Sequence, residues 1–228
     1  MVGLYYRVQN LTAYVMRNLH DERHKMVSEH LQQRGISDHR VIQAMLQVPR
    51  ERFVSAAAHD FAYADMPLRI EQGQTISQPY VVALMVQKCE LQSHDRVLEV
   101  GTGSGYAAAV LAQLVQHVYT IERHRCLYEL ALQRFQDLGY SNITCRLGDG
   151  SLGWPEQAPF DAIVVSAAAP SISPSLLEQI EVGGRMLIPV GPEGGTQRLL
   201  RVRRSTSHDY DQEDLGCVQF VPLIREIH

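Results

Sequence analysis

The sequence predicts an α/β fold, with a doubly wound, mostly parallel sheet of seven strands. Three observations point to it. Short apolar stretches typical of strands alternate with stretches typical of helices. A glycine-rich loop follows the first predicted strand, and a polar segment joins the last two predicted strands. A helical part precedes the sheet, and the last two strands are expected to form an antiparallel hairpin. The 228 residues, 45% of them hydrophobic, can bury one substantial core.

The part of the chain before the sheet is expected to be helical. We expect an N-terminal extension over residues 1–25, a helical part over residues 26–90 and the sheet core over residues 91–228. We expect this extension to form an added amphipathic helix. Within the helical part, residues 38–48 place apolar side chains on one helical face, namely Val41, Ala44, Met45 and Val48. Pro49 ends that helix, because proline has no N–H to donate.

The strands recur through the second half of the chain. They are predicted at residues 96–100, 118–122, 143–147, 161–166, 185–190, 198–203 and 216–224, with the polar segment 205–214 as the turn of the closing hairpin. Helical stretches separate the earlier strands, and such crossovers are what a parallel sheet requires.

The loop after the first predicted strand reads Gly101-Thr102-Gly103-Ser104-Gly105. Glycines at alternate positions accept positive φ angles and let a ligand lie against bare backbone. The Ala- and Leu-rich stretch 104–114 predicts a helix whose free N–H groups point toward that ligand. The dinucleotide fingerprint places its third glycine where this chain has Tyr106. The loop therefore predicts a nucleoside-containing cofactor and disfavours NAD.

Two acidic residues follow the next two predicted strands. Glu122 lies about 20 residues beyond the loop, where an acceptor for a ribose diol is expected. Asp149, between Gly148 and Gly150, could accept from an adenine amino group. Taken singly, Glu122 could be a solvated strand end and Asp149 part of an ordinary turn. Together with the glycine loop they predict a ligand crevice at the carboxyl ends of successive strands.

The segment 73–80, Gly-Gln-Thr-Ile-Ser-Gln-Pro-Tyr, is too polar for a core. One interpretation is a helix start, in which Ser77 caps the helix, Pro79 lies in its first turn and residues 81–88 continue it. A capping side chain beside the cofactor can also contact a substrate, so the two roles are compatible.

These motifs have the form of those in known S-adenosylmethionine-dependent methyltransferases. Segment 73–80, followed by Val-Leu-Glu-Val-Gly-Thr-Gly-Ser-Gly-Tyr at 97–106, resembles the protein-L-isoaspartate O-methyltransferase family. The resemblance runs from about residue 26 to residue 224 and includes Val48-Pro49-Arg50, Tyr63-Ala64-Asp65 and Phe220-Val221-Pro222-Leu223. It implies a Rossmann-like methyltransferase core and methylation of isoaspartyl residues in aged proteins, which starts their repair through a succinimide.

The resemblance also implies the site residues. The cofactor would be S-adenosylmethionine, giving S-adenosylhomocysteine, bound by Glu99, Gly101, Thr102, Gly103, Ser104, Gly105, Glu122, Asp149 and Gly150. Ser77 takes the position of the family's active-site serine, with Gln74 and Thr75 around the isoaspartyl group. A carboxylate is already ionised near neutral pH, so alignment with the methyl group replaces a general base. Acceptor peptides are expected to lie along the last strand near Val221 and Leu223, which could equally be core-strand residues beside an edge proline.

One departure from the family pattern keeps an alternative open. Where the family has Pro-Ile-Gly, this chain has Arg69-Ile70-Glu71. A related carboxyl methyltransferase, acting on a dedicated aspartyl site or a small acid, would show an acceptor pocket narrowed around Arg69 and Glu71. A binding protein that keeps the fold as a scaffold and a nicotinamide oxidoreductase are two further classes; the intact Ser77, Glu122 and Asp149 argue against the first, and the glycine spacing argues against the second.

Composition limits the partners. The formal charge of −4 comes without a basic block, so we expect no nucleic-acid partner, and no stretch predicts a signal peptide or membrane span. The four cysteines are far apart and lack zinc spacing, which favours reduced thiols in a cytoplasmic protein and no metal site. We expect a monomer whose partners are isoaspartyl-containing peptides and proteins.

Overall fold

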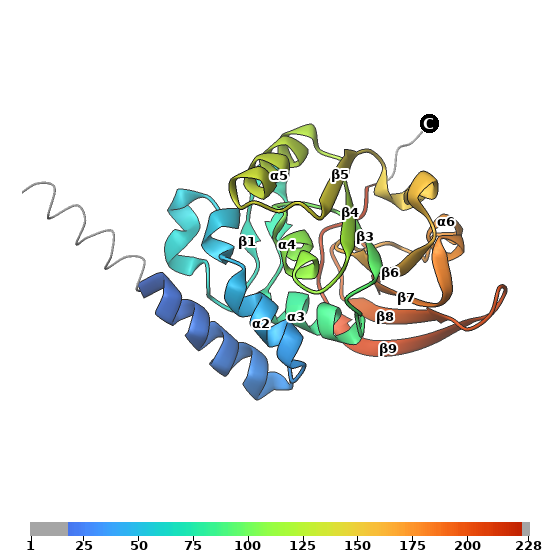
Figure 1. Cartoon of the computed structure of the whole chain (residues 1–228), viewed down its shortest axis with the longest axis horizontal. Helices are drawn as coiled ribbons and strands as arrows, with labels where there is room; N and C mark the ends of the chain where they lie inside the picture. Colours follow the sequence, from blue (N-terminus) through green and yellow to red (C-terminus); the bar gives the residue numbers. More distant parts are fainter. Residues whose placement is uncertain (1–17, 225–228) are drawn as a thin grey trace, which may run out of the picture.

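A seven-stranded sheet runs through the middle of the molecule (Figure 1), and this computed structural model describes residues 18–224. The strand order is β5-β4-β3-β6-β7-β8-β9. The strands are β3 (Arg96–Val100), β4 (His117–Glu122), β5 (Ile143–Leu147), β6 (Phe160–Val165), β7 (Ile180–Val190), β8 (Gln197–Arg204) and β9 (Tyr210–Val218). Strands β3 to β7 pair in parallel, and β8 pairs antiparallel with both β7 and β9. The predicted sheet and closing hairpin are confirmed.

Apolar side chains fill both faces of the sheet. Along β3, Val97 packs in the cluster on one face and Leu98 in the cluster on the other, as the period-2 alternation of a strand requires. Both are fully buried. Burial on both faces explains why the parallel strands read as nearly continuous apolar runs in the sequence.

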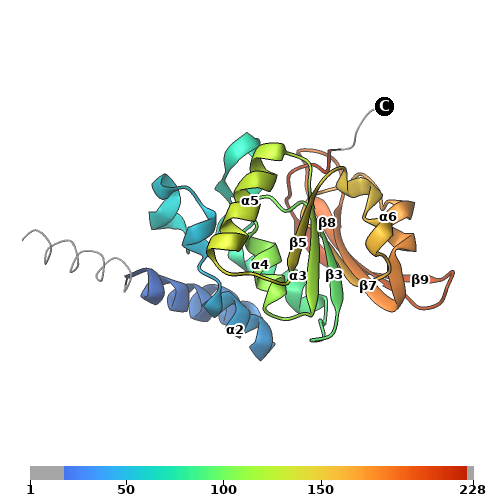
Figure 2. The ribbon, with the colours of Figure 1, turned by 45° about the horizontal axis from the view of Figure 1, so that its top comes forward.

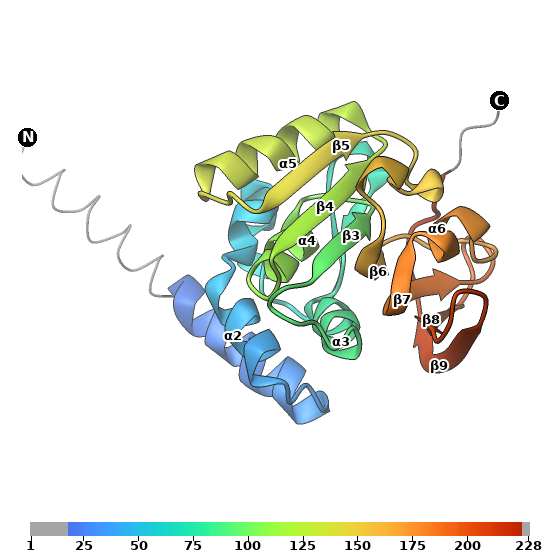
Figure 3. The ribbon, with the colours of Figure 1, turned by 45° about the vertical axis from the view of Figure 1, so that its right-hand side comes forward.

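Helices cover the two faces unequally. Their bounds are α2 (His39–Gln47), α3 (Pro79–Lys88), α4 (Tyr106–Ala112), α5 (Arg125–Asp137) and α6 (Pro174–Glu178). Figure 2 shows α3, α4 and α5 on one side of the sheet and α6 on the other, and Figure 3 shows the strands in their order from β5 to β9. Residues 18–25 are helical and lead into a π-helical turn (Met26–Leu31) and a 3₁₀ turn (Gln32–Arg34). The predicted extension lies mostly outside the described residues.

The first predicted helix is confirmed as α2. Asp38 caps it by accepting a 2.9 Å hydrogen bond from the Arg40 N–H, and Pro49 follows its last turn. Val41, Ala44 and Met45 are buried as expected. They share one apolar cluster with α3, α4 and the sheet, so the helical part packs on the sheet core as part of one continuous interior.

Two predictions about helix starts were wrong. Helix α3 begins at Pro79 with Gln78 in the capping position, so Ser77 lies one residue too early to cap it. The N–H of Tyr80 bonds instead to Asp65 Oδ1 at 3.2 Å. Helix α4 begins at Tyr106 rather than Ser104, because Gly105 has φ of 91° and cannot belong to a right-handed helix.

The end of the chain also differs from the prediction. The connection between β8 and β9 spans only residues 205–209, since the acidic residues after it belong to an exposed edge strand. There Glu213 pairs with Arg201, and Asp214 pairs with Arg198 at 2.6 Å. Strand β9 ends at Val218, not Ile224. Beyond it, the Leu223 N–H donates to the Ala168 carbonyl and the Ala168 N–H to the Val221 carbonyl.

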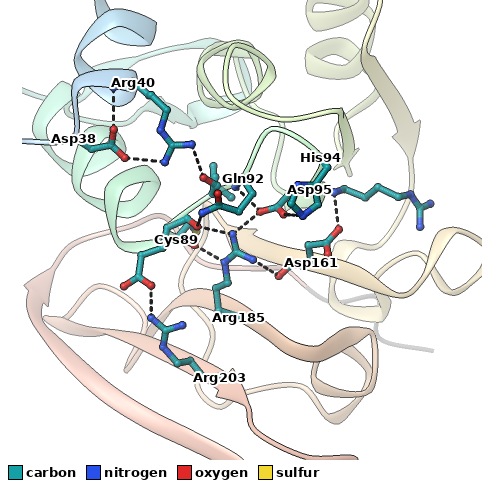
Figure 4. Close-up of polar contacts among 12 residues, drawn as sticks. Asp38, Arg40, Cys89, Gln92, His94, Asp95, Asp161, Arg185 and Arg203 are labelled. Atoms are coloured by element: carbon teal, nitrogen blue, oxygen red, sulfur yellow. Dashed lines mark hydrogen bonds and ion pairs between the residues drawn. The ribbon is translucent and has the colours of Figure 1, made fainter.

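A buried arginine fixes the connection between α3 and β3 at the amino ends of the strands (Figure 4). Arg185 on β7 donates to the carbonyls of Cys89, Glu90 and Asp161 and pairs with Asp95 at 2.5 Å.

Between residues 18 and 224 there is no helix long and apolar enough to cross a membrane. The same range contains no group of three or more His, Cys, Asp or Glu residues that could hold a metal ion.

Candidate active site

A cleft of about 780 Å³, open to solvent, lies at the carboxyl ends of β3, β4 and β6. Strands β4 and β6 flank β3 on opposite sides, so their chains leave the sheet in different directions and open a crevice there. All but two of the residues predicted for the site line this cleft: Gln74, Thr75, Ser77, Glu99, Gly101, Thr102, Gly103, Ser104, Glu122, Gly150, Val221 and Leu223.

Gly101 begins the loop that forms the floor of the cleft. Its φ is 93°, a conformation that residues with a Cβ rarely adopt, and a Cβ there would lie 3.7 Å from Ser166 at the end of β6. The glycine therefore lets the loop turn sharply where the two strands part. Gly103 also has a positive φ, of 53°, and its N–H donates a hydrogen bond to the Glu122 carboxylate.

The two predicted residues outside the cleft lining serve the surrounding structure. A Cβ on Gly105 would lie 2.8 Å from the Phe135 ring, so this glycine allows the loop to approach helix α5. Asp149 caps the short 3₁₀ turn Gly150–Leu152 by accepting a 2.8 Å hydrogen bond from the Ser151 N–H. Gly150 does line the cleft, and a Cβ on it would lie 2.5 Å from Val100.

Glu122 connects the end of β4 to the glycine loop. Its Oε2 accepts a 2.7 Å hydrogen bond from the Gly103 N–H, and its Oε1 accepts one of 2.8 Å from the His124 N–H. The residue is only 5% exposed and lines the cleft. A carboxylate has about four lone-pair sites, so two backbone bonds leave capacity for a diol.

Glu99 is fully buried at the end of β3. The Thr120 hydroxyl donates to its Oε2 at 2.6 Å, and the Thr102 hydroxyl of the glycine loop lies 2.6 Å from that of Thr120. No hydrogen bond from the described residues reaches Oε1, although that atom is buried. Burial raises the pKa of Glu99 to about 8, and the charge of Glu122 adds to the effect, while the Thr120 and Ser166 hydroxyls oppose it. A cation in the cleft would satisfy this carboxyl group.

Ser77 lies where the cleft meets a second cavity, a groove on the neighbouring surface. The two cavities share Thr75, Ser77, Ser166 and Val221, and the groove continues past Arg34, Tyr80 and Phe220. The Ser77 hydroxyl makes no hydrogen bond within residues 18–224, so it is available to a substrate. The residue thus faces the cleft on one side and the groove on the other.

The charged replacements at Arg69 and Glu71 lie on a small hairpin over the glycine loop. Its strands, β1 (Leu68–Arg69) and β2 (Thr75–Ile76), pair antiparallel, and the Ile70 side chain lies near Gly103. Neither Arg69 nor Glu71 lines the cleft or the groove. The positive φ angles of this hairpin fall on Gln72 and Gly73, so Glu71 carries no left-handed strain. The two charged residues therefore do not narrow the cleft or the groove.

The sequence reasoning missed several residues of the site. Ser166 and Ala167 line the cleft directly after β6. The end of the predicted strand 161–166 was a usable signal, because the carboxyl ends of parallel strands meet at one edge. Arg34 gave no such signal. It reaches the groove from a turn far upstream and stacks on Tyr80 at 3.5 Å from the ring centre.

Comparisons with known proteins agree with this geometry. The family model described as protein-L-isoaspartate(D-aspartate) O-methyltransferase (PCMT) matches residues 21–228. The chain is 54% identical over 199 residues to the protein-L-isoaspartate O-methyltransferase of Protochlamydia amoebophila, covering 87% of this chain and 95% of that protein. The Brucella anthropi protein of that name is 54% identical over 209 residues, with coverage of 92% and 96%.

Two solved structures are similar over most of the chain. One, a protein-L-isoaspartate O-methyltransferase, has a TM-score of 0.80 and 28% identity, covering 88% of this chain and 65% of that one. The other is a putative protein-L-isoaspartate O-methyltransferase from Plasmodium falciparum in complex with S-adenosyl-L-homocysteine. It has a TM-score of 0.77 and 27% identity, with coverage of 89% and 98%.

Proposed function

The chain belongs to the protein-L-isoaspartate(D-aspartate) O-methyltransferase family, and on this premise we propose which of its residues carry out the reaction. It is an S-adenosylmethionine-dependent protein carboxyl O-methyltransferase that methylates isoaspartyl residues, the first step of their repair. The methyl ester carries a better leaving group, methoxide, than the free carboxylate does. The neighbouring backbone nitrogen can then attack the ester carbonyl and close a succinimide with loss of methanol, and water opens the ring partly to normal aspartate.

The donor side of the site fits S-adenosylmethionine. When bound, this cofactor supplies an electrophilic methyl group on a positively charged sulfur. Glu122 would accept from the ribose diol. Asp149 is outside the cleft lining, but it precedes Gly150, which lines the cleft, and it would accept from the adenine amino group. Glu99, with its unpaired buried oxygen, would face the cationic methionine end. The bare backbone at Gly101 and Gly103, both in the cleft lining, would leave room for the nucleoside.

On the acceptor side, Ser77 aligns the substrate carboxylate. Its hydroxyl would donate to one carboxylate oxygen while the other attacks the methyl carbon in line with the departing thioether sulfur. Gln74 and Thr75, also in the cleft lining, would shape the pocket around the isoaspartyl group. No proton has to be removed from an ionised carboxylate, so alignment carries the catalysis. The observation that carries the proposal is the free Ser77 hydroxyl at the junction of cleft and groove.

The groove would hold the acceptor peptide on either side of the damaged residue. It is open to solvent and lined by mixed apolar and polar groups, including Tyr80, Val218 and Phe220, which suits substrates of varied sequence. Val221 and Leu223 would contribute side-chain contacts. Their backbone groups that pair with Ala168 are already used.

Four further assignments belong to the proposal. Residues 1–25 form an extension, residues 26–90 carry the acceptor loop, which is segment 73–80, and residues 91–228 carry the cofactor core. The enzyme acts as a monomer, because the large apolar side chains exposed between residues 18 and 224 come from separate elements. Its four unpaired cysteines suit the cytoplasm. Its partners are isoaspartyl proteins, and not nucleic acid or membranes, because the arginines that cluster on β8, Arg198, Arg201 and Arg203, are paired with acids.

The test is methyl transfer from radiolabelled S-adenosylmethionine to matched peptides that contain isoaspartate or aspartate at one position. We expect labelling of the isoaspartyl peptide alone and a large loss of rate in Ser77→Ala with unchanged affinity for S-adenosylhomocysteine. Ser173→Ala, which removes a hydroxyl outside the cleft lining, is the control. Labelling of neither peptide by a protein that binds S-adenosylhomocysteine would point to a dedicated acceptor instead.

A further inference from the structure

Two side chains from the helical part hold the backbone at Ser77 and at the residues directly after it. They are Arg50, directly after Pro49, and Asp65, ahead of the hairpin that carries the acceptor loop. Neither belongs to the cofactor core or lines the cleft or the groove. The chemistry of methyl transfer does not by itself require the arginine of Val48-Pro49-Arg50 or the aspartate of Tyr63-Ala64-Asp65.

Arg50 bonds to the residue that carries the acceptor hydroxyl. It is fully buried, and its Nη2 donates a 2.8 Å hydrogen bond to the backbone carbonyl of Ser77. Its Nε donates one of the same length to the Ala62 carbonyl. The guanidinium lies 4.7 Å from the ring centre of Tyr106, the first residue of α4 after the glycine loop. One planar group thus contacts the acceptor loop, the helical part and the start of the cofactor helix.

Asp65 fixes the residues that follow Ser77. Its Oδ1 accepts from the Tyr80 N–H at 3.2 Å, and its Oδ2 accepts from the Gln78 side chain at 2.8 Å. The Gln78 side chain also donates to the Asp65 carbonyl at 2.9 Å. Arg34 pairs with the same carboxylate at 2.5 Å. Asp65 therefore takes the capping role at the start of α3 that Ser77 does not fill.

We propose that Arg50 and Asp65 are positioning residues for methyl transfer, because together they fix the backbone from which the Ser77 hydroxyl reaches the acceptor carboxylate. The inference rests on the function proposed for Ser77. In-line displacement depends on alignment, and a misplacement of about 1 Å can cost about a hundredfold in rate. Serine has a short side chain, so the position of its hydroxyl follows its backbone closely.

A purely structural role is the alternative, and Arg185 provides the control for it. Like Arg50, Arg185 is buried and donates to backbone carbonyls (Figure 4), but it does so at the amino ends of the strands and lines neither the cleft nor the groove. Arg185→Met removes three bonds to backbone carbonyls and the ion pair with Asp95, so it is at least as disruptive to the fold, yet it does not touch the acceptor loop. A loss of rate that follows from general destabilisation would appear in both variants.

The first experiment compares Arg50→Met, Asp65→Asn and Arg185→Met at a temperature well below the melting point of each. We expect kcat for an isoaspartyl peptide to fall about tenfold to a hundredfold in Arg50→Met, and less in Asp65→Asn, which keeps one acceptor oxygen. Affinity for S-adenosylhomocysteine should stay within about twofold, and Arg185→Met should keep its kcat. Arg50→Lys keeps the charge but cannot reach both carbonyls, so it should recover only part of the rate. Equal losses of kcat in Arg50→Met and Arg185→Met would overturn the proposal.

A double-mutant cycle tests whether Arg50 acts through Ser77. In a Ser77→Ala background, Arg50→Met should lower the rate by much less than in the wild type, because the hydroxyl that it positions is gone. Equal fold losses in both backgrounds would show that Arg50 acts independently of Ser77.

Backbone hydrogen exchange gives a readout that does not need an active acceptor. Exchange at residues 76–82 should speed up in Arg50→Met and Asp65→Asn and stay unchanged in Arg185→Met. If wild-type protein failed to methylate isoaspartyl peptides while this pattern held, the proposed function would fail and the positioning of Ser77 would stand. Unchanged exchange over residues 76–82 in Arg50→Met would remove the basis of the inference.

Discussion

The carboxylate of Glu122 accepts a 2.7 Å hydrogen bond from the backbone N–H of Gly103, across the gap between β4 and the glycine loop. One residue therefore fixes the loop and faces the cleft that the loop lines. A change at Glu122 is expected to affect the ligand contact and the shape of the loop together.

Glu122→Gln should weaken binding of S-adenosylhomocysteine about tenfold to a hundredfold, because a hydrogen bond to a charged group is worth about 1.5–3 kcal/mol. Isothermal titration calorimetry measures this directly. Glu156→Gln removes an exposed carboxylate that pairs with Arg146 and should bind normally. Wild-type affinity in Glu122→Gln would rule out its contact with the ribose.

Glu99 should release a proton when the cofactor binds. Burial raises the pKa of Glu99 to about 8, so the group is mostly protonated at pH 7 in the free protein. A nearby sulfonium and ammonium group favour the carboxylate and lower that pKa. Binding enthalpies of S-adenosylmethionine measured at pH 7 in buffers of different ionisation enthalpy should reveal close to one released proton, and none in Glu99→Gln. A buffer-independent enthalpy in the wild type would mean that Glu99 does not face the cation.

The same group makes stability depend on pH. The pKa of Glu99 rises from its ordinary 4.5 to about 8 on folding, so the folded state binds the proton more tightly than the unfolded state. Its contribution to stability is fully present below pH 4.5 and is lost as the pH rises toward 8. Between pH 5 and 8.5, wild-type protein should lose on the order of a few kcal/mol of unfolding free energy relative to Glu99→Gln.

Urea denaturation of both proteins across this range measures that difference. Glu129→Gln, which alters an exposed carboxylate, should show no such trend against the wild type. If the difference in unfolding free energy between wild type and Glu99→Gln stayed constant with pH, it would contradict the raised pKa of Glu99.

Gly105→Ala should destabilise the fold more than Gly139→Ala. Both glycines have positive φ, which costs alanine about 1–2 kcal/mol. Only at Gly105 does the added Cβ meet a neighbour, the Phe135 ring at 2.8 Å, and such overpacking adds about 1–3 kcal/mol. Chemical denaturation measures the unfolding free energy of both variants, and the difference between their losses gives the cost of the contact with Phe135. Equal losses would show that the loop can move away from α5.

The strands were predicted best where local pattern decides them. Residues 96–100 and 143–147 coincide with β3 and β5, because apolar runs bounded by polar residues identify buried strands. Strand β7 begins earlier than predicted, at Ile180. Its first residues include Gly183 and Gly184, which carry no strand signal, and Phe160 pairs with Ile180 before a register shift. That pairing is visible only across the sheet.

The site was predicted unevenly for a similar reason. Glu122, at the end of β4, could be located by counting from the glycine loop, and it does line the cleft, whereas Asp149, two residues after β5, does not. Ser77 was expected to cap α3, yet Asp65 provides the acceptor for that helix. No local pattern predicts that a carboxylate more than ten residues upstream will reach the Tyr80 N–H.

The sequence by itself determined the fold class, the glycine loop and the family, because strand periodicity, positive-φ positions and motif spacing are properties of neighbouring residues. The tertiary structure decided which distant segments meet. It brought Arg50 to the Ser77 carbonyl, placed Ser166 beside Gly101 and extended the cleft into a groove that Arg34 lines. These contacts depend on strand order and on how the helical part packs over the sheet, and local sequence does not encode either.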